Sequence, residues 1–141
     1  MEFETLVLQD TYISLLSYHK IFTAFFALPF VANLLIVFLS AENLAGMVKK
    51  MWFVTPIIFF LLSVSILSGI NIWIFGNIGL KLSVIAMMTF CVFVFIGEIF
   101  RFKILKVARR TNREAMLGYV RFCRILYSID LFFFILLFAI V

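Results

Sequence analysis

The chain of 141 residues is 66% hydrophobic and only 13% charged, with a mean hydropathy of +1.23. Soluble domains are about 45–50% apolar and about 25% charged, so this composition excludes a water-soluble fold and predicts one polytopic membrane domain over residues 1–141. The net charge of +5 would suggest nucleic-acid binding in a soluble protein. We expect no nucleic-acid partner here, because the excess cations lie in loops that face anionic lipid.

The first predicted span covers about residues 11–40 and is longer than the roughly 20 residues that a bilayer needs. Residues 1–10 are acidic and mildly apolar, and we expect them to form a short external segment. No basic residue precedes Lys20, so this opening is unlike a secretory signal. Pro29 lies in the middle of the span and predicts a kink, because proline removes a helical hydrogen bond.

The second predicted span covers about residues 51–75 and follows two lysines, Lys49 and Lys50. We expect Pro56 to fall in the first turns of this helix, where a missing N–H is least costly. A short turn that contains glycine comes next, and it carries Lys81 at the start of the following span.

The third predicted span covers about residues 80–100, and its helix should continue to Arg110 because no glycine or proline interrupts the chain beyond the lipid. Residues 111–114 read T-N-R-E, which fits a capping box of Ser/Thr followed three residues later by Glu. This motif predicts a helix start at Thr111. That helix then runs through a fourth span over about residues 124–141.

The orientation follows from the basic residues, of which the bend between the last two spans carries most. Lys49 and Lys50 lie at the other bend on the same side, and only Lys20 and Lys81 lie on the opposite side. The positive-inside rule therefore places both basic bends in the cytoplasm. The sequence predicts an all-α antiparallel four-helix bundle in a bacterial inner membrane, with both termini periplasmic. The basic residues of the last bend are Arg101, Lys103, Lys106, Arg109, Arg110, Arg113, Arg121 and Arg124.

Two carboxylates fall at membrane depth, where an ionisable group costs roughly 2.5–3.5 kcal/mol on insertion scales. Asp130 lies in the fourth span, as a proton or cation carrier or as the partner of an arginine or of a hydroxyl on another helix. Glu98 lies three residues before Arg101, so an ion pair within one helix is available. Alternatively, Glu98 and Asp130 form a shared site in the inner half of adjacent helices.

His19 is the only histidine, and histidine ligates haem and other metals. One histidine cannot supply both axial ligands, so a haem would need Met, Lys or Cys as the second ligand, or a symmetric dimer. An interfacial histidine that is hydrogen-bonded to backbone or water is the alternative. Lys81 lies on the same outer side, where it could pair with an anionic group or anchor the helix end by snorkelling.

The layout resembles the four-helix bacterial membrane proteins that oxidise protoporphyrinogen, and the related copper-resistance D type. His19 precedes the first hydrophobic run, and Pro29 lies within it. The second span opens with KKMWFVTP and ends with SILSGINIW, and Lys81-Leu82 opens the third. The resemblance implies a bundle that handles haem b or a porphyrin, with His19 and Lys81 at the matching positions. The chain departs from that family at Phe30, where the family carries arginine.

Three classes of function are consistent with these residues, and no hydrolytic or nucleotide-binding motif is present. The first is a redox protein with His19 as a haem ligand and Lys81 on a propionate. The second is a small proton-coupled transporter that uses Glu98 and Asp130. The third is a non-catalytic accessory subunit that docks a larger membrane complex through its basic hairpin. In each class we expect a lipid-embedded protein that forms a homo-oligomer or joins a larger complex.

Overall fold

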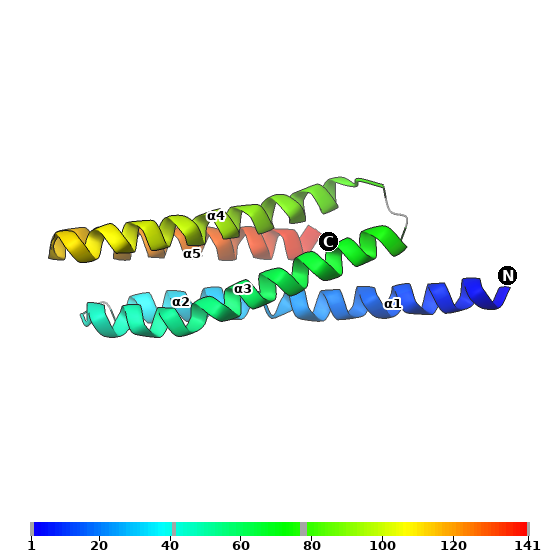
Figure 1. The fold of residues 1–141 in the computed structure, drawn as a ribbon, viewed down its shortest axis with the longest axis horizontal. Helices are drawn as coiled ribbons and strands as arrows, with labels where there is room; N and C mark the ends of the chain where they lie inside the picture. The colour runs from blue at the N-terminus through cyan, green and yellow to red at the C-terminus, as the bar shows by residue number, and fades with distance from the viewer. Residues whose placement is uncertain (1, 41, 77–78, 141) are drawn as a thin grey trace.

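The computed structural model describes residues 2–40, 42–76 and 79–140, and these residues form helices joined by short turns, without a strand (Figure 1). Four stretches are long and apolar enough to cross a membrane, and the first of them comprises two helices. The prediction of an all-helical chain with four long apolar segments is confirmed. The helices are α1 (Glu2–Ala24), α2 (Ala27–Leu39), α3 (Leu44–Phe75), α4 (Leu82–Thr111) and α5 (Arg113–Ile140).

The first segment is interrupted at Phe25 and Phe26, four and three residues before Pro29. Pro29 has no N–H to donate to the carbonyl of Phe25, and that oxygen accepts a 3.1 Å hydrogen bond from the N–H of Leu28 instead. The predicted kink is therefore confirmed, one turn before the proline. Residues 2–10 of the expected external segment are helical and belong to α1, which begins at Glu2.

The second segment starts earlier than predicted. Asn43 caps α3, and its Oδ1 accepts a 3.0 Å hydrogen bond from the N–H of Gly46. A Cβ on Gly46 would lie 2.9 Å from the amide of Asn43, so the glycine makes room for this cap. Since α3 begins at Leu44, Pro56 lies in the helix interior, and the expectation that it occupies the first turns is wrong.

The turn between α4 and α5 also differs from the predicted capping box. Thr111 is the last residue of α4, and its Oγ1 donates to the carbonyl of Val107 at 2.9 Å. Asn112 caps α5 instead, because its Oδ1 accepts a 2.8 Å hydrogen bond from the N–H of Ala115. The predicted continuation of the α4 helix through Arg110 is confirmed.

The two basic bends lie at the same end of the molecule. Figure 1 shows the α2–α3 and α4–α5 turns together at one end, whereas the N-terminus and the α3–α4 connection lie toward the other. The fold therefore brings together the two groups of cations that the sequence separates by about fifty residues. A single orientation in the bilayer can satisfy the positive-inside rule at both bends.

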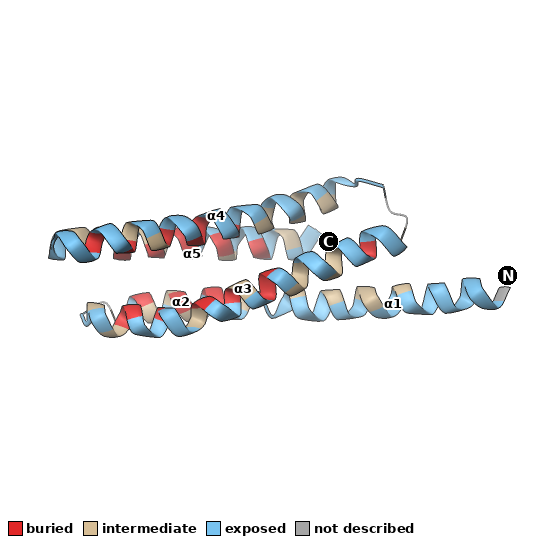
Figure 2. Ribbon diagram, in the orientation of Figure 1, coloured by how far each residue is buried: buried red, intermediate tan, exposed pale blue. Residues whose placement is uncertain are grey.

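Buried residues concentrate in the half of the molecule near these bends (Figure 2). Helix α5 packs against both α4 and α2, and α1 lies along α3, but α3 and α4 touch far less. An aromatic cluster of Phe26, Phe30, Phe90 and Phe134 closes the core at the end away from the basic bends. Most of α1 is exposed, since it packs along α3 on one side only.

Candidate functional site: a buried polar cluster

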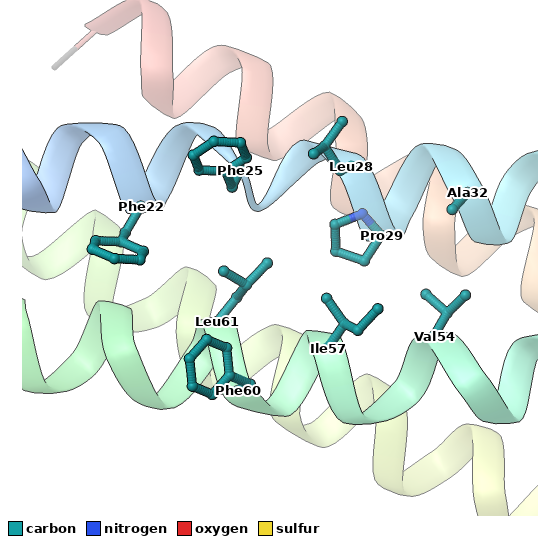
Figure 3. A pocket seen from close by; sticks show the side chains of 9 residues that line it. All are labelled: Phe22, Phe25, Leu28, Pro29, Ala32, Val54, Ile57, Phe60 and Leu61. Atoms are coloured by element: carbon teal, nitrogen blue, oxygen red, sulfur yellow. The ribbon is translucent and has the colours of Figure 1, made fainter.

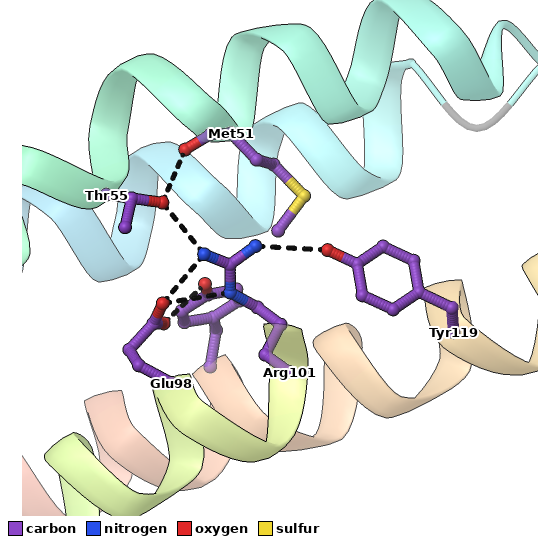
Figure 4. Close-up of polar contacts among 6 residues, drawn as sticks. Met51, Thr55, Glu98, Arg101 and Tyr119 are labelled. Carbon is purple, nitrogen blue, oxygen red and sulfur yellow. Dashed lines mark hydrogen bonds and ion pairs between the residues drawn. The ribbon is translucent and has the colours of Figure 1, made fainter. Parts of the chain in front are cut away.

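Arg101 is the centre of a polar cluster enclosed by apolar side chains, and it is only 2% exposed. Its Nε and Nη2 donate to Glu98 Oε2 at 2.9 and 2.7 Å. Nη2 also donates to Thr55 Oγ1 at 2.8 Å, and Nη1 donates to the hydroxyl of Tyr119 at 3.1 Å (Figure 4). The guanidinium thereby joins α3, α4 and α5 through one planar group with several fixed donors.

Glu98 has hydrogen bonds on both of its carboxylate oxygens. While Oε2 pairs with Arg101, Oε1 accepts a 2.7 Å hydrogen bond from the hydroxyl of Tyr127. The hydroxyl of Thr55 donates a 2.9 Å hydrogen bond to the carbonyl of Met51, so its oxygen presents a lone pair to the guanidinium. The predicted i,i+3 pair is confirmed, and it is deeply buried rather than interfacial. Glu98 is therefore a neutralised and hydrogen-bonded group.

A close approach of α4 and α5 positions this cluster. A Cβ on Gly97 would lie 2.8 Å from Leu126 Cδ1, so the glycine lets the two helices pack closely one residue before Glu98. At this separation Tyr127, the neighbour of Leu126, reaches the carboxylate from the facing helix. The close packing at Gly97 and the hydrogen bond between Tyr127 and Glu98 are therefore parts of the same contact between α4 and α5.

Asp130 lies one turn beyond Tyr127 on the buried side of α5 and is 1% exposed. Its Oδ1 has no hydrogen-bond partner. The guanidinium of Arg124 stacks on the ring of Phe38 at 4.8 Å, and the only ion pair in the described residues joins Glu98 and Arg101. The alternative in which an arginine pairs with Asp130 therefore has no counterpart in the structure.

Asn33 is another buried side chain without hydrogen-bond partners, and among the described residues Oγ of Ser65 and Nε of Arg124 are further buried atoms that lack one. It is 0% exposed on α2, and neither its Oδ1 nor its Nδ2 has a hydrogen-bond partner. It belongs to the α2 stripe that faces the core, together with Phe30 and Val37. Because a buried polar group without a hydrogen bond is costly, Asn33 and Asp130 mark a place where the protein tolerates an incomplete polar site.

His19 and Lys81, the two residues matched to the haem family, lie outside this cluster. His19 is half-buried on α1, and its Nδ1 lies 2.7 Å from Ser68 Oγ on α3. Lys81 is exposed at the N-cap of α4. In the described residues no group of three or more His, Cys, Asp or Glu side chains is placed to hold a metal ion.

An apolar groove follows the break between α1 and α2, with a cavity volume of about 390 Å³. Its walls are hydrocarbon and aromatic side chains from both sides of Pro29 and from the facing part of α3, and Figure 3 shows Phe22 and Pro29 opposite Ile57 and Leu61. The groove contains no group that could pair with a haem propionate.

The sequence pointed to Glu98 and Asp130 but not to their partners. Tyr119, Tyr127 and Asp130 lie at spacings of eight and three residues, which places them on one side of a helix. This stripe of polar side chains in an apolar span could have predicted that the two tyrosines face the same buried site as Asp130. Thr55 offered no such signal, since its role depends on the packing of α3 against α4.

Comparison of this chain with known protein families, with curated proteins and with solved structures finds no match.

Proposed function

We propose that this protein is a small proton-translocating carrier of the bacterial inner membrane, in which Asp130 takes up and releases the proton. The observation that carries this proposal is a charge imbalance among the buried ionisable groups, Glu98, Arg101 and Asp130. Glu98 and Arg101 neutralise each other through two short hydrogen bonds, whereas Asp130 has no cation beside it. One carboxylate therefore remains without compensation in an apolar environment.

The cost of that imbalance gives Asp130 a reason to exchange a proton. An isolated ionised carboxylate is expensive to keep in a low-dielectric interior, and a bound proton removes the charge. Intramembrane carboxylates that are not tied into an ion pair are typical of proton pathways. Glu98 has the opposite character, because Arg101 and Tyr127 hold both of its oxygens. The second of the three classes is therefore the best supported, with Asp130 as the working group.

Asp130→Asn should abolish proton flux without reducing the yield of folded protein, because asparagine keeps the shape of the side chain but cannot carry the proton. Purified protein would be placed in vesicles with a pH-sensitive dye inside, and a potassium diffusion potential would drive protons inward. The flux of the variant should fall to that of protein-free vesicles.

Asn71→Leu is the matched control, since Asn71 is exposed on α3 and should leave the flux unchanged. Equal loss of flux and of folded yield in Asp130→Asn would assign the carboxylate a structural role. Wild-type flux no greater than that of empty vesicles would contradict the proposed function.

A second candidate function is a haem-associated protein, and the position of His19 favours it. Because Ser68 engages Nδ1, the imidazole is oriented and Nε2 is the nitrogen left to bind iron. Purified protein should then show a Soret band that is lost in His19→Ala and retained in Lys20→Ala. The second axial ligand would come from another copy of the chain. Colourless protein from haem-replete cells would contradict this function.

A further inference from the structure

Besides Oγ of Ser65 and Nε of Arg124, three buried polar atoms of the described residues lack a partner, and they belong to side chains on α2 and α5. They are Oδ1 and Nδ2 of Asn33 and Oδ1 of Asp130. Each belongs to a side chain that is at least 99% buried. Since buried donors and acceptors in folded proteins are almost always paired, the three atoms indicate one missing element that would satisfy them together.

The packing register places the two side chains about one helical turn apart along the α2–α5 interface. Phe26 stacks with Phe134, and Phe30 contacts Tyr127, so α2 and α5 run antiparallel with Asn33 close to the level of Tyr127. Asp130 lies one turn away on the same stripe of α5. Asn33 and Asp130 therefore face a common interface from opposite helices.

We propose that Asn33 is the hydrogen-bonding partner of a protonated Asp130, an assignment that deepens the proposed function and rests on it. The proton resides on Oδ2 of Asp130, and this O–H donates to Oδ1 of Asn33. In return, Nδ2 of Asn33 donates to Oδ1 of Asp130, which closes a cyclic acid–amide pair after rotation of the two side chains. One proton from water thereby satisfies all three orphaned atoms, and its release leaves a carboxylate and breaks one of the two bonds.

A metal ion would satisfy the same atoms less well. A hard cation binds oxygen, and it would leave Nδ2 of Asn33 as a buried donor without an acceptor. A monovalent or divalent cation would also need several further oxygens. The nearby oxygens of Glu98 are already occupied by Arg101 and Tyr127. The proton is therefore the ligand that fits this set of atoms.

None of the described groups around Asp130 forms an ion pair with it. On α4, Glu98 lies toward the basic bends, Cys91 lies on the outer side, and the buried Val94 lies between them. On α5 itself, Tyr127 is engaged with Glu98. The guanidinium of Arg124, six residues before Asp130, lies over the ring of Phe38 on α2, and its buried Nε has no hydrogen-bond partner. Helix α2 contains no titratable side chain, so Asn33 is its only polar contribution.

Infrared spectroscopy of the purified protein in lipid tests the pair directly. The spectrum of the wild type minus that of Asp130→Asn at neutral pH should contain the carbonyl band of a protonated carboxylic acid. In Asn33→Leu this band should move to higher frequency, because the acid loses both hydrogen bonds. Asn71→Leu should leave the band in place.

The exchange of the two residues provides a second measurement that does not depend on Asn33→Leu folding. The double variant Asn33→Asp with Asp130→Asn retains one acid and one amide, so the hydrogen-bonded band should return at nearly its wild-type frequency. A band that Asn33→Leu leaves unmoved, or the absence of an acid band from the difference spectrum, would overturn the pair. The expected bands together with no flux in vesicles would overturn the proposed carrier and leave the pair standing.

Discussion

Arg101→Met should destabilise the protein more than any substitution in the exposed part of the basic bend. Removal of the guanidinium leaves Glu98 as a buried charge without its cation, and loss of one partner of a buried pair costs about 3–5 kcal/mol. Tyr119 and Thr55 also lose their contact with Arg101. Unfolding of the purified protein in detergent with increasing denaturant measures the change.

Arg110→Met is the matched control, because Arg110 lies on the same helix but is exposed. It should leave the free energy of unfolding unchanged within error. Arg101→Lys should fall between the two, since an ammonium keeps the charge but cannot reproduce the planar fork. The double variant Glu98→Leu with Arg101→Met should recover part of the loss, because it removes both charges together. Equal stability of Arg101→Met and Arg110→Met would contradict the central role of the cluster.

Single cysteines at the two ends of the bundle should react in an all-or-none manner with a membrane-impermeant maleimide. In a background of Cys91→Ser and Cys123→Ala, Gly79→Cys should be labelled in intact spheroplasts. Glu42→Cys and Arg110→Cys should be labelled only after lysis, because the positive-inside rule retains both basic bends in the cytoplasm. All three positions are exposed in the structure.

Lysed spheroplasts serve as the control, since every variant should react there to the same extent. Labelling of Arg110→Cys in intact spheroplasts would reverse the orientation. Labelling of Glu42→Cys and Arg110→Cys on different sides would contradict the arrangement in Figure 1, in which the two bends share one end.

The sequence predicted those features that depend on neighbours along the chain. The number of apolar segments, the kink near Pro29 and the uninterrupted helix to Arg110 follow from local composition, glycine and proline. The pair between Glu98 and Arg101 follows from their spacing on one helix. Local motifs failed where two candidates compete within a few residues, as when Asn112 rather than Thr111 caps α5.

By itself, then, the amino-acid sequence determined four long apolar segments, the kink near Pro29 and an uneven distribution of cations. Only the tertiary structure decided that Thr55, Tyr119 and Tyr127 complete the cluster around Arg101 and that Asn33 shares an interface with Asp130. The physical reason is that lipid is as apolar as the protein core, so a membrane helix carries little contrast between its two sides. The rotation of each helix about its axis, and hence the partner that each polar group meets, becomes defined only when the helices pack.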